Sequence, residues 1–84
     1  MKILNSFIYN DYNIITFFDD GRVTKYNFKE FIKNAPFDNL KNYKYFKNNF
    51  KFNWYKIYWD DETDCPADIL YSNGKNIGSL DINK

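Results

Sequence analysis

Two runs of β-branched and aromatic residues flank an Asp-Gly dipeptide in the first third of the chain. The segment from Ile14 to Tyr26 reads IITFFDDGRVTKY, with Asp20 and Gly21 at its centre. This pattern predicts a β-hairpin, because Gly accepts the positive φ that a type I′ turn demands. Both faces of such a hairpin carry apolar side chains, so we expect it to be covered on both sides, inside the domain. The expected cross-strand pairs are Asp19 with Arg22, Phe18 with Val23, Phe17 with Thr24 and Ile15 with Tyr26.

The segments on either side of this hairpin predict a third strand and a short helix. Ile3 to Tyr9 is typical of a strand, and the polar cluster at residues 10–13 of a turn, so the first three strands should form a meander. Asn27 followed three residues later by Glu30 resembles a capping box at a helix start. This helix should end just before Pro36, because the residue before a proline avoids the α region.

The middle of the chain changes from a period of three to a period of two. Apolar residues recur every third position over residues 37–46, which predicts one or two turns of α- or 3₁₀-helix. From Phe50 to Trp59 the alternation is typical of strands and predicts a second hairpin that turns within residues 53–56.

The last third of the chain predicts an acidic loop, a closing helix and a tail. Residues 60–64 are mostly acidic, and Pro66 suits the first turn of a helix over residues 66–72, which Gly74 ends. The tail, residues 75–84, forms either an edge strand through Ile77 and Leu80 or a loose end. We therefore expect an α+β fold with a small antiparallel sheet, built from a meander and a hairpin, and two short helices. The chain is expected to be a single domain over residues 1–84, with a core over 3–72.

Composition excludes several classes of protein. Twelve basic and eleven acidic residues leave a net charge of +1, far from the balance of a dedicated nucleic-acid binder. The mean hydropathy of -0.71 argues against a membrane span. A lone cysteine allows no intrachain disulfide, and the N-terminal apolar run is too short for a signal peptide, so we expect a cytoplasmic protein. Without histidine the commonest general base and metal ligand is missing, and we expect neither an enzyme nor a cofactor.

Charge is unevenly distributed over the second half of the chain. Residues 41–56 contain five lysines and no acid, interleaved with aromatic residues, and residues 57–68 contain five acids and no base. Lysines beside exposed rings suit either single-stranded nucleic acid or a protein partner. A core strand with lysines on its outer side explains the same composition. Nine Phe, eight Tyr and two Trp are too many to bury in 84 residues, so several rings should be exposed.

Two features could carry other chemistry. The carboxylates of residues 60–68 have no EF-hand spacing and no glycine for its sharp turn, so a solvated acidic turn that protects a strand edge is preferred over a metal site. Cys65 would need a lowered pKa to act as a nucleophile, which the start of the next helix could supply; a small residue near a helix cap is the simpler interpretation.

The order of these features resembles the DUF2442 family of small bacterial proteins. The resemblance extends over about residues 3–72 and rests on Phe18-Asp19-Asp20-Gly21, Tyr26-Asn27-Phe28, Phe37-Asp38-Asn39-Leu40 with Phe46, Trp59, Asp64, Pro66, Leu70 and Tyr71. The segment between Phe50 and Trp59 is tighter than in the family, and the residues after Gly74 have no counterpart. The resemblance implies an α+β fold without established catalytic activity. Because members are often encoded beside small toxins, it also implies an antitoxin-like or regulatory binding role.

Together these observations predict a non-enzymatic protein-binding module. It would act as an antitoxin-like protein or as an inhibitor of a bacterial effector or nuclease, in a toxin–antitoxin or phage or mobile-element context. The alternative is a weak single-stranded nucleic-acid binding domain that uses residues 41–56. The predicted partner-binding residues are Lys44, Tyr45, Lys47, Lys51, Trp54 and Tyr55, with a secondary acidic contact at Asp60, Asp61 and Glu62.

Overall fold

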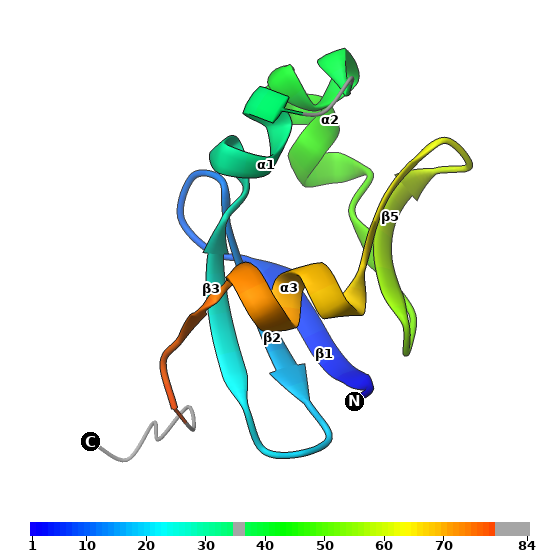
Figure 1. Ribbon diagram of the computed structural model, residues 1–84. Helices are drawn as coiled ribbons and strands as arrows, with labels where there is room; N and C mark the ends of the chain where they lie inside the picture. Colours follow the sequence, from blue (N-terminus) through cyan, green and yellow to red (C-terminus); the bar gives the residue numbers. More distant parts are fainter. Residues whose placement is uncertain (35–36, 79–84) are drawn as a thin grey trace.

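The structure is a computed structural model that describes residues 1–34 and 37–78. It has the predicted α+β architecture, shown in Figure 1. Its elements are β1 (Ile3–Ile8), β2 (Asn13–Phe18), β3 (Val23–Asn27), α1 (Phe28–Asn34), the 3₁₀-helix η1 (Asp38–Lys41), α2 (Tyr43–Asn48), β4 (Lys51–Phe52), β5 (Lys56–Asp60), β6 (Thr63–Pro66), α3 (Ala67–Asn73) and β7 (Lys75–Asn76).

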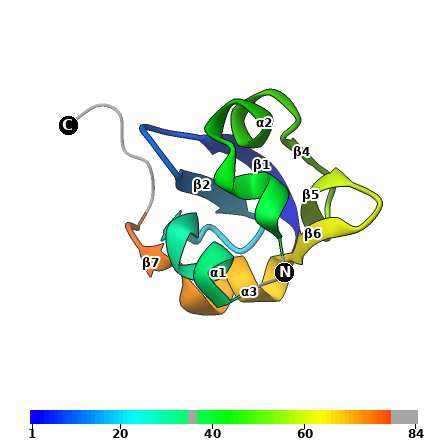
Figure 2. The same ribbon diagram turned by 90° about the horizontal axis from the view of Figure 1, so that it is seen from above.

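The strands form two antiparallel sheets, where the sequence predicted one. The first sheet has the order β1-β2-β3-β7 and contains the predicted meander, and the second has the order β4-β5-β6 and contains the predicted second hairpin. Figure 2 shows α1 and α3 on one side of the four-stranded sheet and β4, β5 and β6 beyond the edge formed by β1. Over the described residues the chain has three α-helices, one more than predicted.

The turn of the central hairpin lies where the sequence predicts it, but the predicted register is wrong by one residue. Phe17 pairs with Val23, and Phe18 donates its N–H to the Arg22 carbonyl at 2.9 Å, which leaves a loop of residues 19–21. Gly21 takes a φ of +93°, whereas neither loop aspartate has a positive φ, so the type I′ turn does not form. A positive-φ Gly at the end of a three-residue loop is the next commonest hairpin connection.

The two loop aspartates make hydrogen bonds that differ from those implied by the predicted register. Asp19 was expected opposite Arg22, but its carboxylate accepts the Lys2 N–H at 2.8 Å and its own N–H donates to the Lys2 carbonyl at 2.9 Å. Asp20 accepts the Arg22 N–H at 2.9 Å instead. Side-chain acceptors next to the turn therefore stabilise a longer loop than the dipeptide alone indicates.

The prediction that both faces of this hairpin are covered is also wrong. Ile14 and Phe18 belong to the main core cluster, whereas Phe7 and Phe17, which pack together on the opposite face, lie outside it. Phe7 keeps 36% of its surface exposed. The hairpin is central in its sheet, because β2 lies between β1 and β3, but one face of that sheet remains partly open to solvent.

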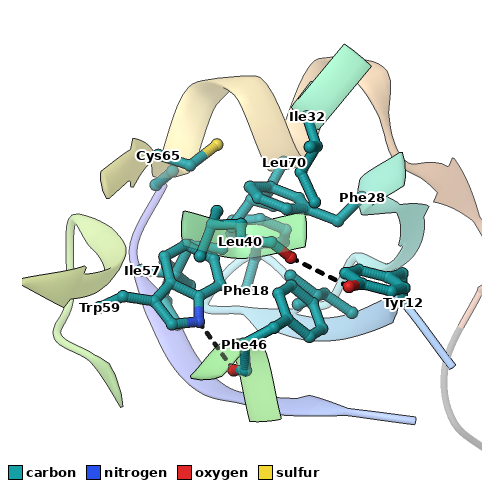
Figure 3. Close-up of a cluster of buried hydrophobic side chains, with 13 residues drawn as sticks. Tyr12, Phe18, Phe28, Ile32, Leu40, Phe46, Ile57, Trp59, Cys65 and Leu70 are labelled. Carbon is teal, nitrogen blue, oxygen red and sulfur yellow. Dashed lines mark hydrogen bonds between the residues drawn. The ribbon is translucent and has the colours of Figure 1, made fainter. Parts of the chain in front are cut away.

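The core forms where the rings of α1, α2 and β5 meet the four-stranded sheet. Phe28, Phe46 and Trp59 are almost fully buried, with ring centroids 5.2–6.0 Å apart. Figure 3 shows two hydrogen bonds that satisfy polar atoms here, and the indole N–H of Trp59 makes one of them, donating to the Phe46 carbonyl at 2.8 Å. The other comes from Tyr12, predicted as part of a turn but 9% exposed, whose hydroxyl donates to the Leu40 carbonyl at 3.0 Å.

Asparagine side chains cap the first two α-helices, and of these two caps the sequence predicted only Asn27. Asn27 accepts the Lys29 N–H at 3.1 Å at the start of α1, and Asn42 accepts the Lys44 N–H at 3.0 Å at the start of α2. The predicted end of the first helix, at residues 35–36, lies outside the described residues. Pro66, the predicted first residue of the last helix, instead precedes it, and α3 begins one position later than predicted, at Ala67.

The segment after the acidic turn forms a strand that the sequence analysis missed. In β6, Thr63 and Cys65 are buried and alternate with partly or fully exposed residues. Gly74 ends α3 as predicted but at a φ of −70°, without the left-handed conformation of a typical glycine cap. It is required by space, because a Cβ there would lie 2.6 Å from the Leu70 carbonyl oxygen. The start of the tail pairs with β3 as β7, and the predicted contribution of Leu80 lies outside the described residues.

Candidate functional site

The structure divides the six predicted binding residues between two ends of the second sheet. Lys44, Tyr45 and Lys47 lie on α2, and Lys51 lies on β4, the short strand that follows α2. Trp54 and Tyr55 form the turn between β4 and β5. Figure 1 shows α2 at one end of the molecule and this turn beyond the far end of β5. A single continuous surface that contains all six residues is therefore not formed.

The α2 group presents charge but few free rings. Phe46 points into the core and is fully buried, so Lys44 and Lys47, on other sides of this short helix, are exposed. Tyr45 is half-buried, and its hydroxyl donates a hydrogen bond to Asp60. Lys51 donates from Nζ to the Trp59 carbonyl at 3.4 Å. The lysines of this group that remain available to a partner are therefore Lys44 and Lys47.

The β4–β5 turn holds two large rings in the solvent. The side chain of Asn53 accepts the Tyr55 N–H at 3.0 Å and the Lys56 N–H at 2.9 Å, which fixes the turn locally. The Trp54 carbonyl accepts the Ile3 N–H at 2.8 Å, which ties the turn to the start of β1. Even so, 59% of the Trp54 surface and 48% of the Tyr55 surface are exposed. The backbone of the turn is fixed while its rings are free to contact a partner.

Lysines flank these rings. The Trp54 and Tyr55 rings meet edge to face at 4.8 Å, Lys2 Nζ lies 5.7 Å from the Trp54 ring, and Lys56 Nζ lies 5.7 Å from the Tyr55 ring. We call Lys2, Trp54, Tyr55 and Lys56 the turn patch. Lys56 also bonds to Asp64 at 3.3 Å, so part of its charge is neutralised. Rigid aromatic rings beside cations are typical of the centre of a protein interface.

The predicted acidic contact lies beside a surface hollow of about 670 Å³ between η1 and the β5–β6 turn. Asp61 and Glu62 are exposed, whereas Asp60 is held by Tyr45 and by the side-chain N–H of Asn39 at 3.2 Å. The hydrogen bond from Tyr45, followed by one from Thr63, lowers the pKa of the Asp60 carboxyl below its ordinary value.

Within residues 1–34 and 37–78, no group of three or more His, Cys, Asp or Glu side chains is placed to hold a metal ion. Cys65 lies in β6 and is fully buried, so the start of α3 does not activate it as the sequence suggested it could. Burial, reinforced by the charges of Asp64 and Asp68, raises the pKa of its thiol to about 12. A thiol in this state is a poor nucleophile at neutral pH.

Exposed large hydrophobic side chains also occur on β1 and directly after it, where the sequence did not predict a binding surface. Leu4, Phe7 and Tyr9 are 64%, 36% and 56% exposed. A signal was present in the sequence, since Ile3 to Tyr9 is apolar on both sides of the strand while only one side can face the core.

Comparison with known proteins identifies one family. Residues 7–76 match DUF2442, a family described as a protein of unknown function. The chain belongs to the DUF2442 family. No curated protein and no solved structure matches it. The resemblance predicted from the order of sequence motifs is therefore confirmed.

The residues that carry the DUF2442 pattern hold the fold together rather than form the turn patch. The Phe18 ring meets the Tyr71 ring edge to face at 5.0 Å, and the Tyr71 hydroxyl donates to Asp20. The Arg22 guanidinium lies 4.4 Å from the Tyr71 ring centroid and donates to the Tyr71 carbonyl at 3.1 Å. These contacts fasten α3 to the central hairpin. Phe18, Asp20 and Tyr71, on which the resemblance rests, therefore hold the fold together, and Trp54 and Tyr55, also within the matched residues 7–76, are exposed.

No helix of the described residues is long and apolar enough to cross a membrane.

Proposed function

We propose that this DUF2442 protein is a non-enzymatic protein-binding module whose main contact is the turn patch. The observation that carries the proposal is the exposure of Trp54 and Tyr55, 59% and 48%, on a turn with a fixed backbone. Aromatic residues in the centre of an interface supply most of its binding energy. The turn backbone loses little freedom on binding, because hydrogen bonds already hold it in the free protein.

The charges around the rings indicate the kind of partner surface. Lys2 and Lys56 lie within 6 Å of the two rings, so a partner with carboxylates around an apolar pocket would meet both features. Lys44 and Lys47 on α2 lie at the other end of the second sheet and would act mainly by attracting an acidic partner at longer range. The exposed carboxylates of Asp61 and Glu62 supply a separate, secondary contact.

A small domain that works by covering another protein suits the role of an antitoxin or of an inhibitor of a bacterial effector or nuclease. We include this role in the proposal. Its support is the pair of exposed rings on a fixed turn; the burial and raised pKa of the Cys65 thiol support the non-enzymatic part of the proposal alone. Nothing in this proposal requires a cofactor.

The test is affinity purification of the partner with the full-length protein and matched variants. Trp54→Ala should reduce recovery of the partner at least about tenfold, because truncating a central ring commonly costs 2 kcal/mol or more. Tyr9→Ala is the matched control, since Tyr9 is similarly exposed, at 56%, but lies at the far end of β1. Equal recovery with Trp54→Ala, or equal losses with both variants, would contradict the proposal.

Binding of single-stranded nucleic acid is the alternative function for the lysines and aromatic residues of residues 41–56. A second measurement distinguishes it from protein binding. The lysines of α2 lie apart from Trp54 and Tyr55, and Lys51 is engaged by backbone carbonyls, so the described residues form no continuous track of charge and rings. We expect no salt-dependent binding of a single-stranded oligonucleotide at low salt. Binding that falls with salt and disappears when Lys44, Lys47 and Lys51 are changed to Glu would replace the protein-binding proposal.

A further inference from the structure

A second surface lies at the other end of β1, where this strand and α2 border a hollow of about 400 Å³. One wall is the backbone and side chains of residues 6–8 together with Asn10, and the other wall consists of Tyr43, Lys47 and Phe50. β1 is the edge strand of the four-stranded sheet, and Figure 2 shows α2 beside it. The hollow therefore runs along an unpaired sheet edge.

The backbone of β1 presents hydrogen-bonding groups to this hollow. The Tyr9 N–H donates to the Asn13 carbonyl at 2.8 Å, so odd-numbered positions in this part of β1 bond to β2. By the alternation of an antiparallel ladder, the N–H and C=O groups of Ser6 and Ile8 point away from β2. The Ser6 N–H is occupied by the side chain of its neighbour Asn5, at 2.9 Å, where a strand would otherwise bind.

The nearest strand does not fill this edge. In the described residues, the backbone hydrogen bond between β1 and the β4–β5 hairpin runs from the Ile3 N–H to the Trp54 carbonyl, at the start of β1. Residues Asn5 to Ile8 contain no charge and no proline, the two devices that most often protect an edge from pairing. Ser6 is 4% exposed and Ile8 is partly buried, so another strand pairs with this part of β1 once the Asn5 side chain, which occupies the Ser6 N–H, moves aside.

The side chains around the hollow indicate what that strand carries. Phe7 and Tyr43 are 36% and 39% exposed and offer apolar contacts. Lys47 is the charged side chain among the lining residues, and Lys44 is exposed on the same helix. Among the residues that the structure describes, no carboxylate lines the hollow. Charge complementarity therefore favours a strand with carboxylates toward α2.

We infer that the edge of β1 beside α2 receives an extended acidic segment of a partner protein as an added strand. The segment exchanges backbone hydrogen bonds with Ser6 and Ile8, displaces the Asn5 side chain, and directs carboxylates toward Lys47. This inference goes beyond the turn patch, because it uses different residues at the opposite end of β1. Either surface can bind without the other.

The experiment is a titration of the full-length, ¹⁵N-labelled protein with a peptide of alternating Glu and Val residues, about eight residues long, the length of an ordinary strand. The amide signals of Ser6 and Ile8 should shift and saturate, while those of Trp54 and Tyr55 should not. A peptide of alternating Lys and Val should bind at least about threefold more weakly, because Lys47 repels it.

Two variants test the mechanism against a matched control. Lys47→Glu should weaken binding of the acidic peptide at least about threefold, whereas Lys75→Glu, the same charge change at the opposite edge of the sheet, should leave it unchanged. Ile8→Pro removes an outward N–H without removing a bond to β2 and should abolish the saturable shifts, in a protein whose other signals stay dispersed.

Several results would overturn the inference. These are no saturable shift at Ser6 and Ile8, equal weakening by Lys47→Glu and Lys75→Glu, or the same shifts with a short single-stranded oligonucleotide in place of the peptide. Failure here leaves the turn patch untouched, because recovery of a partner that depends on Trp54 is measured separately.

Discussion

Two neighbouring threonines in the four-stranded sheet allow a sharp test of the structure. Thr16 in β2 and Thr24 in β3 are cross-strand partners, and both are fully buried. The Thr16 hydroxyl lies 3.0 Å from the Ser6 hydroxyl, and one donates to the other. The Thr24 hydroxyl is the buried side-chain polar atom for which the described residues provide no hydrogen-bond partner. The same substitution should therefore have opposite effects at the two positions.

Valine replaces each hydroxyl with a methyl group of similar size. At Thr24 it removes a buried polar group whose desolvation is not offset, so Thr24→Val should raise the free energy of unfolding by about 1 kcal/mol. At Thr16 it removes a buried hydrogen bond and should lower the free energy of unfolding by about 1 kcal/mol. In a domain of this size each change corresponds to a shift of about 4–8 °C in Tm.

Urea unfolding followed by circular dichroism measures both variants on the same scale, with the two tryptophans unchanged. The comparison needs equal m-values, so that a change in midpoint reports a change in stability. If Thr24→Val destabilises the protein as much as Thr16→Val, the Thr24 hydroxyl has a partner in solution and the reasoning is refuted.

Three further predictions, made with four substitutions, test other parts of the structure. Gly74→Ala should lower the free energy of unfolding by about 1–3 kcal/mol in urea, because its Cβ would lie 2.6 Å from a carbonyl oxygen of α3; wild-type stability would contradict this. Trp59→Phe should cost about 2–4 kcal/mol, since it leaves a cavity and a buried carbonyl without its donor, whereas Trp54→Phe should change stability by less than about 0.5 kcal/mol. The pKa of Asp60 is lowered in the fold, so its stabilisation is complete above the ordinary carboxyl pKa and disappears as pH falls. Asp60→Asn should therefore lose less Tm than wild type between about pH 5 and pH 3, and parallel curves would contradict the assignment.

Local signals predicted most of the fold, and their failures have physical causes. The Asp-Gly dipeptide located the central turn, but the register depended on Asp19 binding Lys2, a contact 17 residues away in sequence. Strand β6 was missed because Thr63 and Cys65, on either side of the acidic residue Asp64, give an alternation too short to indicate a strand. The strand is recognised by its pairing with β5. Gly74 was correctly predicted to end a helix, but the reason is lack of space: a Cβ would lie 2.6 Å from the Leu70 carbonyl oxygen and 2.8 Å from the Thr24 side chain, and no local pattern contains Thr24.

The candidate site was predictable in part. An excess of rings over available core volume predicted exposed aromatic residues, and Trp54 and Tyr55 are exposed. The sequence could not show that α2 and the β4–β5 turn lie at opposite ends of a sheet, because adjacency along the chain was the sole guide to adjacency in space. Tyr45 was expected at the surface and is half-buried, since its hydroxyl reaches Asp60, 15 residues later.

The separation between fold-determining and exposed residues has a consequence for the substitutions that this protein tolerates. The contacts of Tyr71 with Phe18, Asp20 and Arg22 fasten α3 to the hairpin, so any chain that keeps this pattern can keep the fold. The turn between β4 and β5 is tied to the rest of the molecule through its backbone, by the Ile3 N–H to the Trp54 carbonyl and the Ala67 N–H to the Tyr55 carbonyl, so its two exposed rings can change without loss of the core. Substitutions of Trp54 and Tyr55 should therefore change what the turn patch of this protein binds while its fold is kept, which circular dichroism of the variants checks.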